Sequence, residues 1–279
     1  MIQPVQRSAT LLDDIETTHP AAGEVALWWL GQSGYAIKTA SALAYTDLYL
    51  SEYLTAKYAN TAKPHVRMTE SPLRPDEVTN ASWVFTSHKH SDHLDPGTLP
   101  PLFEASPDAK LILPAAHIEH AVSLGLARER LLPMRGDDTL DAGPIHVHSF
   151  PAAHPDLDYD RATGYSFLGF GLEMDGIRIY HSGDTVVYAG LAERLRAFQP
   201  HIALLPINGR AGGAGTPPNM NAAEAVELAQ AVGVPLVIPN HYDMFAFNTA
   251  DVSEFVALAQ AQGVPFRVLL CGERFLWRV

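Results

Sequence analysis

The stretch His88-Lys89-His90-Ser91-Asp92-His93 places three imidazoles and one carboxylate within a single short turn. Imidazole nitrogens and carboxylate oxygens are ligands that divalent ions such as zinc prefer. The stretch follows residues 82–86, Ser-Trp-Val-Phe-Thr, whose apolar, β-branched and aromatic side chains predict a buried strand. Open α/β folds build their sites where such strands end. We therefore predict a metal site, in which His88 and His90 bind one ion while Asp92 and His93 turn towards a second.

The alternative is a solvated loop rich in histidine, because 13 of the 279 residues are histidine. Chance rarely places four such ligands in six positions, which disfavours this alternative. Four more candidate ligands or supports come directly after strand-like runs: Asp47 after residues 42–46, His154 after 145–150, Asp184 after 179–183 and His241 after 236–240.

The H-x-H-x-D-H string resembles the signature of the metallo-β-lactamase superfamily. In that family an Asp ends an early strand and the signature follows, and then come a lone His, a strand-end Asp and a late His. Those positions are filled here, in order, across roughly residues 24–279. Residues 28–34, Trp-Trp-Leu-Gly-Gln-Ser-Gly, and 240–245, Asn-His-Tyr-Asp-Met-Phe, are most similar to the branch of L-ascorbate-6-phosphate lactonases.

Spacing, refined by this resemblance, assigns a role to each residue. Asp184 would bridge two ions, since a carboxylate has two oxygens to offer. Asp47 would hold a ligand imidazole in the right tautomer. His181 could share that task or be a packed core residue. Asp92 and Asp184 are also the predicted catalytic residues. One ion is assigned to His88, His90 and His154, and the second to Asp92, His93 and His241.

Two ions about 3.5–4 Å apart would lower the pKa of a shared water towards ~7, so that hydroxide could attack a carbonyl or phosphoryl centre. Zinc or manganese is expected, and iron also tolerates His and Asp ligands. Because the candidates around two ions leave positions open for water, a purely structural metal site is disfavoured.

The composition fits a globular protein with a sizeable core, at 47% hydrophobic and 18% charged residues. The net charge of −12 and the lack of a basic run argue against nucleic-acid binding. The single cysteine, Cys271, excludes an intrachain disulfide and fits a reducing compartment. No apolar stretch reaches 18 residues and the amino terminus lacks the pattern of a signal peptide, so we expect a cytoplasmic protein without membrane contact.

Residues 1–23 predict an N-terminal arm or a short peripheral helix, and residues 24–279 predict one domain. Asn221 and Glu224 have capping-box spacing and open a helix that ends near Val232, before Gly233. A similar pattern predicts a last helix between Asp251 and Gly263, followed by a strand over residues 268–272. The resemblance implies an α/β fold, an αβ/βα four-layer sandwich of two mixed sheets with helices outside. Residues 24 to about 150 would form one half and 151–279 the other.

The loop of residues 208–218 carries four glycines and one arginine, Arg210. It is either a flexible connection or a cleft edge where Arg210 and Asn208 meet a substrate anion. Tyr242, together with Phe245 and Phe247, is predicted to form a pocket wall beside His241. We expect Arg210→Ala to raise KM for an anionic substrate by about ten- to a hundredfold.

The leading functional hypothesis is a metal-dependent hydrolase of a lactone or related cyclic ester of a sugar acid, phosphorylated or not. The alternative is a phosphodiesterase that acts on a small cyclic phosphodiester. An iron redox protein and a non-catalytic metal-binding module are less favoured. The expected partner is a small-molecule substrate, and a homo-oligomer is compatible with the sequence.

Overall fold

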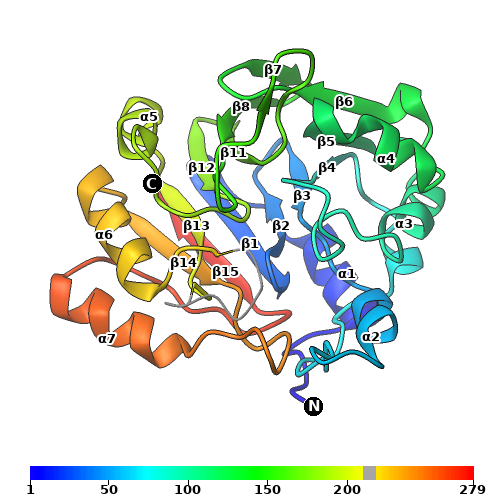
Figure 1. The fold of residues 1–279 in the computed structure, drawn as a ribbon, viewed down its shortest axis with the longest axis horizontal. Coiled ribbons are helices and arrows are strands. Elements are labelled where there is room, and N and C mark those ends of the chain that lie inside the picture. The colour runs from blue at the N-terminus through cyan, green and yellow to red at the C-terminus, as the bar shows by residue number, and fades with distance from the viewer. Residues whose placement is uncertain (210–217) are drawn as a thin grey trace.

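The computed structural model describes residues 1–209 and 218–279. Two mixed β-sheets lie face to face and helices cover the outer face of each, so the predicted αβ/βα sandwich is confirmed (Figure 1). In Figure 1, α5, α6 and α7 lie on the left flank, and α1, α3 and α4 lie on the right.

The first sheet has the strand order β15-β1-β2-β3-β4-β5-β6. Pairing is antiparallel from β15 to β3 and parallel from β3 to β6. Its strands are β1 (Glu24–Gly31), β2 (Gly34–Lys38), β3 (Leu43–Thr46), β4 (Trp83–Phe85), β5 (Lys110–Pro114), β6 (Leu131–Met134) and β15 (Arg274–Arg278).

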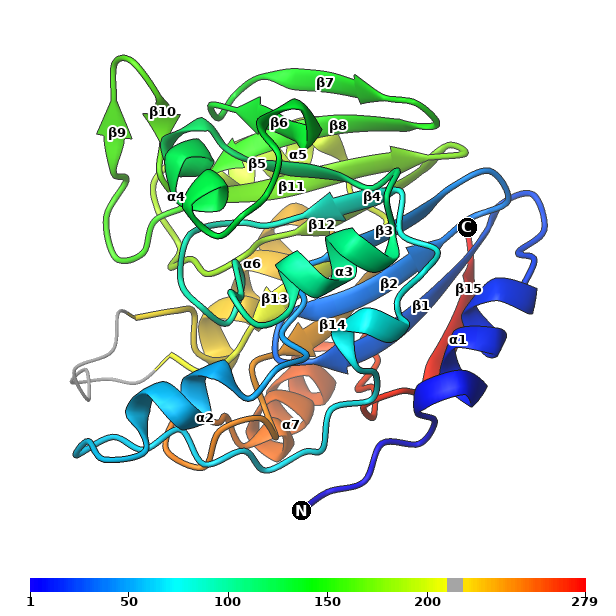
Figure 2. The same ribbon diagram turned by 90° about the vertical axis from the view of Figure 1, so that its right-hand side faces the viewer.

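The second sheet has the order β14-β13-β12-β11-β8-β7, with parallel pairing from β12 to β14 and antiparallel pairing elsewhere. Its strands are β7 (Thr139–Ala142), β8 (Ile145–Pro151), β11 (Leu168–Met174), β12 (Ile177–His181), β13 (Ile202–Pro206) and β14 (Leu236–Asn240). A small hairpin of β9 (Tyr159–Asp160) and β10 (Gly164–Tyr165) projects beyond the two sheets (Figure 2).

Apart from α2, whose Leu54 packs with Tyr49 and Phe245, the helices divide between the two outer faces. Leu11 and Ile15 of α1 are fully buried against the first sheet, so part of the predicted N-terminal arm packs on the sandwich. The helices are α1 (Ser8–Thr17), α2 (Tyr53–Tyr58), α3 (Leu99–Ala105), α4 (Ile118–Ser123), α5 (Leu191–Phe198), α6 (Ala222–Val232) and α7 (Val252–Gln262), with 3-10 turns η1 (Pro75–Glu77), η2 (Ala115–His117) and η3 (Arg128–Arg130).

The sequence of β1 explains why this strand lies in the middle of the molecule. Alternate side chains of a strand point to opposite faces of the sheet. Val25, Leu27 and Trp29 belong to the core between the two sheets. Their neighbours Ala26 and Trp28 belong to the core beneath α1, α3 and α4. Both faces of β1 are therefore buried, as its unbroken apolar run indicates.

The predicted halves, residues 24 to about 150 and 151–279, differ from the two sheets both at the internal boundary and at the carboxyl end. The first sheet ends with β6 at Met134, and the second begins with β7 at Thr139, so the boundary lies before residue 150. β15 then returns from the carboxyl end of the chain and pairs with β1, with Trp277 opposite Val25. The first half therefore includes the last strand.

The strand predicted over residues 268–272 is also wrong, because these residues form an extended segment and a turn before β15. The hydroxyl of Tyr242 explains the difference. It donates to the carbonyl oxygen of Leu269 at 2.5 Å and accepts from the Leu269 N–H at 3.2 Å. A side chain thus satisfies the backbone groups that a neighbouring strand would have used.

The two capped helices are confirmed. α6 begins after Asn221, whose side chain accepts from the backbone N–H of Glu224 while the Glu224 carboxylate accepts from the Asn221 N–H. α7 begins after Asp251, and both helices end at a glycine with positive φ. Across residues 1–209 and 218–279, no helix is long and apolar enough to cross a membrane.

Candidate metal centre

The predicted ligands gather at one edge of the sandwich because the strands that precede them run the same way. β3 and β4 are parallel neighbours in the first sheet, and β12, β13 and β14 are parallel neighbours in the second. β8 has the same direction as β12, since both pair antiparallel with β11. The carboxyl ends of these strands carry Asp47, the loop His88–His93, His154, Asp184 and His241.

Asp47 is the fully buried anchor of this edge. One carboxylate oxygen, Oδ1, accepts from the Ser87 N–H at 2.7 Å. The other, Oδ2, lies 2.9 Å from Nδ1 of His93 and 2.7 Å from Nε2 of His181. Burial on its own raises the pKa of Asp47, but His93 and His181 outweigh it and hold the pKa well below its usual range. Asp47 is therefore a carboxylate that receives protons from both rings.

This contact sets the tautomer of the neutral His93 ring, because the proton on Nδ1 points to Asp47 and the lone pair is then on Nε2. Ser87 extends the same effect to His88. The Ser87 hydroxyl donates to Asp47 at 2.7 Å and lies 3.0 Å from Nδ1 of His88. It can then accept the Nδ1 proton, which leaves Nε2 of His88 with its lone pair. One buried aspartate thus orients two ring nitrogens.

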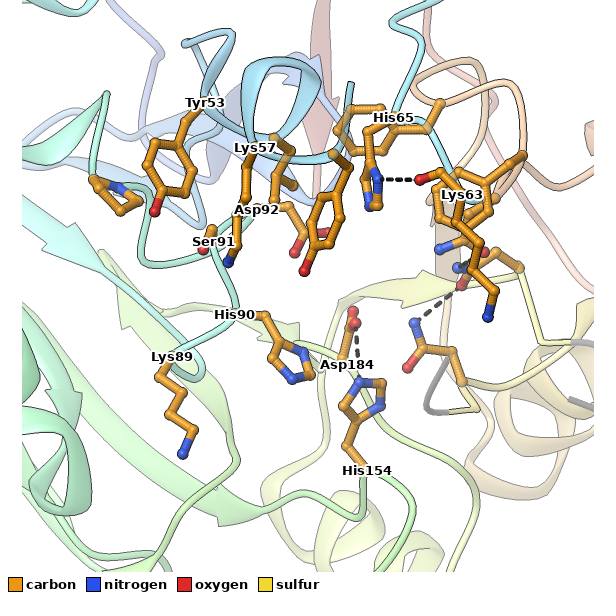
Figure 3. Close-up of a pocket in the computed structure, with 18 of the residues that line it drawn as sticks. Tyr53, Lys57, Lys63, His65, Lys89, His90, Ser91, Asp92, His154 and Asp184 are labelled. Carbon is orange, nitrogen blue, oxygen red and sulfur yellow. Dashed lines mark hydrogen bonds and ion pairs between the residues drawn. The ribbon is translucent and has the colours of Figure 1, made fainter. Parts of the chain in front are cut away.

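The structure brings the other predicted ligands together in two clusters that share Asp184. His88, His90, His154 and Asp184 form one cluster, and His93, His241 and Asp184 form the other, each with donor atoms within 4.8 Å of one another. Oδ1 of Asp184 lies 2.7 Å from Nε2 of His241, and Oδ2 lies 3.6 Å from Nε2 of His154. Figure 3 shows His90, His154 and Asp184 directed at one point. The shared carboxylate has the arrangement that spacing predicted for a bridge.

Asp92 lies beside the second cluster and is not counted in it. Its Oδ2 is 3.7 Å from Nε2 of His93 and accepts from Nε2 of Gln32 at 2.8 Å. Gln32 also accepts the backbone N–H of His241 through its carbonyl oxygen, at 3.2 Å. Gln32 therefore ties the loop of Asp92 to the loop of His241.

Three residues at this edge have left-handed backbone conformations without being glycine, namely Gln32 at φ 51°, Asp47 at φ 40° and His241 at φ 63°. Such conformations are unfavourable for these side chains and persist where the surrounding structure enforces them, often at functional sites. Each of the three follows a strand end and turns a side chain or carbonyl towards the clusters.

The electrostatics of the second cluster favour a positive charge. Burial lowers the pKa of His93, but Asp184, Asp47 and Asp92 outweigh it and raise the pKa well above its usual range. Burial on its own raises the pKa of Asp184. His241 and His93 outweigh burial and hold this pKa well below its usual range. In the first cluster, burial and the neighbouring imidazoles lower the pKa of His88 well below its usual range, so this ring is neutral.

The donor atoms themselves test whether a metal ion fits. Nε2 of His88 is buried without a hydrogen-bond partner among the described residues, and Nε2 of His93 and of His241 face Oδ1 of Asp184 at 3.3 and 2.7 Å without hydrogen bonds of good geometry. A buried polar atom without a partner costs about 1–3 kcal/mol. Each of these atoms offers a lone pair when its ring is neutral, and they converge in two groups around a shared carboxylate. The set therefore fits divalent metal ions better than it fits a hydrogen-bond network.

A cavity of about 500 Å³ opens above the clusters and is lined by His90, Asp92, His154 and Asp184. Of the predicted substrate residues, Asn208 lines it, held by Asn219 and Asn248 at 3.0 and 3.2 Å. Phe245 and Phe247 line it as well. Arg210 lies outside the described residues, and its role stays a prediction.

The prediction that Tyr242 forms part of the pocket wall is wrong. Its side chain is buried, stacks on Trp29 with ring centroids 4.3 Å apart and bonds Leu269. It belongs to the core and not to the lining of the cavity, because its ring packs on Trp29 and its hydroxyl is held by the backbone of Leu269. His181 is fully buried against Asp47 and is not part of either cluster.

Sequence reasoning missed three kinds of residue at the site. Ser87 and Gln32 orient ligands, and their signal was adjacency to His88 and a place in the Trp-Trp-Leu-Gly-Gln-Ser-Gly stretch. Phe167 packs its ring against His88 and His154, with centroids 5.2 and 5.4 Å away, and gives no recognisable signal in the sequence. Lysines at the cavity mouth were also missed.

The sandwich and the shared-carboxylate clusters define a metal-binding α/β protein with its site between two sheet edges. A model of the β-lactamase superfamily domain matches residues 59–242. The chain belongs to the metallo-β-lactamase superfamily. Together with the His and Asp clusters, membership makes it a metal-dependent hydrolase of that superfamily.

Similar proteins include a metal-dependent hydrolase of Archaeoglobus fulgidus, 30% identical over 206 residues, which are 72% of this chain and 82% of the relative. A probable L-ascorbate-6-phosphate lactonase of Escherichia fergusonii is 24% identical, with 96% of this chain and 83% of the relative aligned. Among solved structures, an isothiocyanate hydrolase from Delia radicum gut bacteria has a TM-score of 0.74 at 17% identity and covers 91% of this chain and 99% of its own. The last likeness concerns the fold alone.

Proposed function

We propose that this protein is a metal-dependent lactonase that opens a lactone or related cyclic ester of a sugar acid, including phosphorylated ones. The observation that carries the proposal is the pair of His/Asp clusters sharing Asp184 at the base of a cavity of about 500 Å³. Such a cavity has the size of a small-molecule site. The similarity to probable L-ascorbate-6-phosphate lactonases, which extends over 96% of this chain, supports the substrate class.

His88, His90 and His154 would hold one divalent ion, and His93, His241 and Asp92 a second, with Asp184 between them. When bound, such ions polarise a carbonyl group and lower the pKa of water. Asp47 and Ser87 keep the ring protons of His93 and His88 on Nδ1, away from the ions.

The reaction adds water to the acyl carbon of the ring ester, breaks the bond from that carbon to the ring oxygen, and leaves an open hydroxy acid. The attacking water gives up a proton and the ring oxygen takes one. Asp92 and Asp184 are the carboxylates that line the cavity. Asp92 faces the cavity and is held by Gln32 through one oxygen, Oδ2. We assign it the proton transfer, in which the carboxylate accepts from water and donates to the departing oxygen.

The test is a metal analysis of protein purified without added metal, followed by a panel of lactones and small cyclic phosphodiesters. We expect at least one ion per chain and hydrolysis of a lactone. His90→Ala and Asp184→Ala should abolish metal-dependent hydrolysis, because each removes a donor and Asp184 belongs to both clusters.

His146→Ala is the matched control, because the exposed His146 side chain pairs with Asp141 and is in neither cluster. Its activity should equal that of the wild type. Hydrolysis of cyclic phosphodiesters without any lactone turnover would replace the proposal by the phosphodiesterase alternative. Active protein with well under one ion per chain would contradict metal-dependent hydrolysis itself.

A further inference from the structure

The mouth of the cavity carries a charge opposite to that of the protein. The chain has a net charge of −12 and five lysines, Lys38, Lys57, Lys63, Lys89 and Lys110. Of these, Lys57, Lys63 and Lys89 line the cavity. Of its acidic lining residues, Asp184 belongs to both clusters and Asp92 lies beside the second, with Oδ2 3.7 Å from Nε2 of His93. Among the described residues, these three lysines are the positively charged side chains at the cavity that lie outside the proposed ligand set.

The lysines come from different segments and surround the clusters (Figure 3). Lys57 extends from α2, with its Nζ 5.2 Å from the centre of the Tyr58 ring. Lys63 follows α2, and Lys89 lies in the ligand loop on another side of the opening. The electrostatic effects of two of them overlap: burial is the larger cause of the lowered pKa of His120, and Lys89 and Lys57 both lower it further.

The segment that carries Lys57 and Lys63 is held by aromatic packing. The His65 ring stacks on Tyr58 with centroids 4.3 Å apart and meets Phe247 edge-on at 4.5 Å and Phe245 at 5.0 Å. His65 also bonds the carbonyl oxygen of Lys63 through Nδ1 at 3.1 Å. These rings tie the segment to the chain just after His241. The backbone that carries the two lysines is thus fixed relative to the metal clusters.

We propose that Lys57, Lys63 and Lys89 form an anion subsite that holds an oxyanion of the substrate away from the bond that is broken. For the identity of the substrate this inference rests on the proposed function. Ammonium groups on flexible stems act as point charges that suit a compact phosphate, sulfate or carboxylate. On a protein of net charge −12, a positive cleft also concentrates an anionic substrate near the site.

A phosphate ester fits this subsite better than a carboxylate. At equal distance the Coulomb energy doubles when the charge on the ligand doubles. Three ammonium groups around one opening therefore favour a dianion over a monoanion of similar size. The subsite would make a phosphorylated lactone a better substrate than its unphosphorylated twin, mainly through KM.

The first experiment measures binding of inorganic phosphate to metal-free protein by calorimetry at pH 8 and low ionic strength. Without metal, the result does not depend on hydrolysis. We expect the double variant Lys57→Met/Lys63→Met to weaken binding by about tenfold, since charged hydrogen bonds near a surface contribute modestly. Lys110→Met is the control. Lys110 lies at the amino end of β5, whereas the site lies at the carboxyl ends of the strands, and its Nζ donates to the Glu129 carbonyl oxygen.

Equal phosphate affinity in the wild type and the double variant would overturn the subsite, as would a lack of phosphate binding by the wild type. Lys89 is left unchanged in this experiment because it stands between the ligands His88 and His90. Lys57→Arg keeps the charge and should retain most of the affinity. A loss in Lys57→Arg as large as that in Lys57→Met would assign Lys57 to packing and contradict the proposal.

The second experiment compares a phosphorylated lactone with its unphosphorylated twin on the metal-loaded enzyme. Lys57→Met should raise KM for the phosphorylated lactone by about three- to tenfold, with little change in kcat, because the contact is uniform along the reaction. KM for the twin should not change. Equal losses on both lactones would overturn the subsite. If neither lactone is hydrolysed, the proposed function fails, while phosphate binding to the metal-free protein still decides the subsite.

Discussion

At the scale of single residues, Asp47 shows how much of the site depends on a group that would touch no metal. Its two oxygens accept hydrogen bonds from Ser87, His93 and His181, with donor–oxygen distances of at most 2.9 Å. The carboxylate accepts the protons that would otherwise occupy the metal-facing nitrogens. Two imidazoles therefore depend on one buried aspartate for their orientation.

Asp47→Asn should weaken metal affinity by about 10–100-fold, the usual effect of losing a group that orients a ligand imidazole. An amide keeps the shape but lacks the charge, and its nitrogen cannot accept from His93. Competition between the protein and a coloured zinc chelator measures the change. Asp137→Asn is the control, because Asp137 pairs with Arg194 on the surface. Unchanged affinity in Asp47→Asn would show that the ion selects the tautomers without help.

His117 provides a test of pH dependence outside the metal ligands. Burial lowers its pKa to about 4, and its Nε2 donates to the Ser166 carbonyl oxygen at 2.6 Å. Since the unfolded pKa is about 6.5, the unfolded chain binds more protons between pH 6.5 and 4. The stabilisation from neutral His117 is therefore complete above pH 6.5 and is lost as the pH falls towards 4, by at most about 3 kcal/mol.

The measurement compares urea unfolding of wild type and His117→Gln across that range. Glutamine keeps a donor for Ser166 but does not titrate, so the stability difference between the two proteins should shrink as the pH falls from 6.5 to 4. Titration of the other histidines is common to both proteins and cancels. A difference that is constant with pH would mean that His117 is protonated in the folded protein.

At the scale of elements, α6 can be tested by its cap. Asn221→Ala removes the acceptor for the Glu224 N–H and should destabilise the protein by about 1 kcal/mol. This corresponds to a decrease in Tm of about 2 °C for a chain of this length. Gln230→Ala on the exposed side of α6 should change Tm much less. Equal Tm values for Asn221→Ala and wild type would mean that packing alone fixes the start of the helix.

The elements also show what the sequence could reveal. α6 and α7 were predicted because capping side chains and a terminal glycine are local signals. The segment 268–272 was not, because an apolar run does not reveal that the Tyr242 hydroxyl bonds Leu269. The pairing of β15 with β1 likewise joins residues about 250 apart, which no local pattern predicts.

The same distinction holds for the site. The positions of His88, His90, His154 and Asp184 followed from strand ends, because parallel strands bring their carboxyl ends to one edge. The lysines at the cavity mouth could not be predicted, since their approach depends on how α2 packs against the chain after His241.

At the scale of the whole molecule, the metal clusters lie across the interface between the two sheets. The loop His88–His93 follows β4 of the first sheet, whereas His154, Asp184 and His241 follow strands of the second. Each cluster takes ligands from both sheets. A bound ion would therefore link the two layers, and this arrangement of donors exists only in the folded protein.

Removal of metal should consequently lower the thermal stability of the whole molecule. An ion that binds only the folded state stabilises it by about 2.7 kcal/mol at a free concentration of 100 Kd. For a chain of this size this corresponds to a Tm higher by about 5 °C than in excess chelator. Calorimetric scans with and without metal measure the shift. Asp184→Ala should lose most of it, because Asp184 belongs to both clusters, whereas His146→Ala should keep it. A full Tm shift in Asp184→Ala would mean that the ion binds elsewhere. An equal loss of the shift in both variants would mean that the stabilisation comes from nonspecific binding to surface histidines.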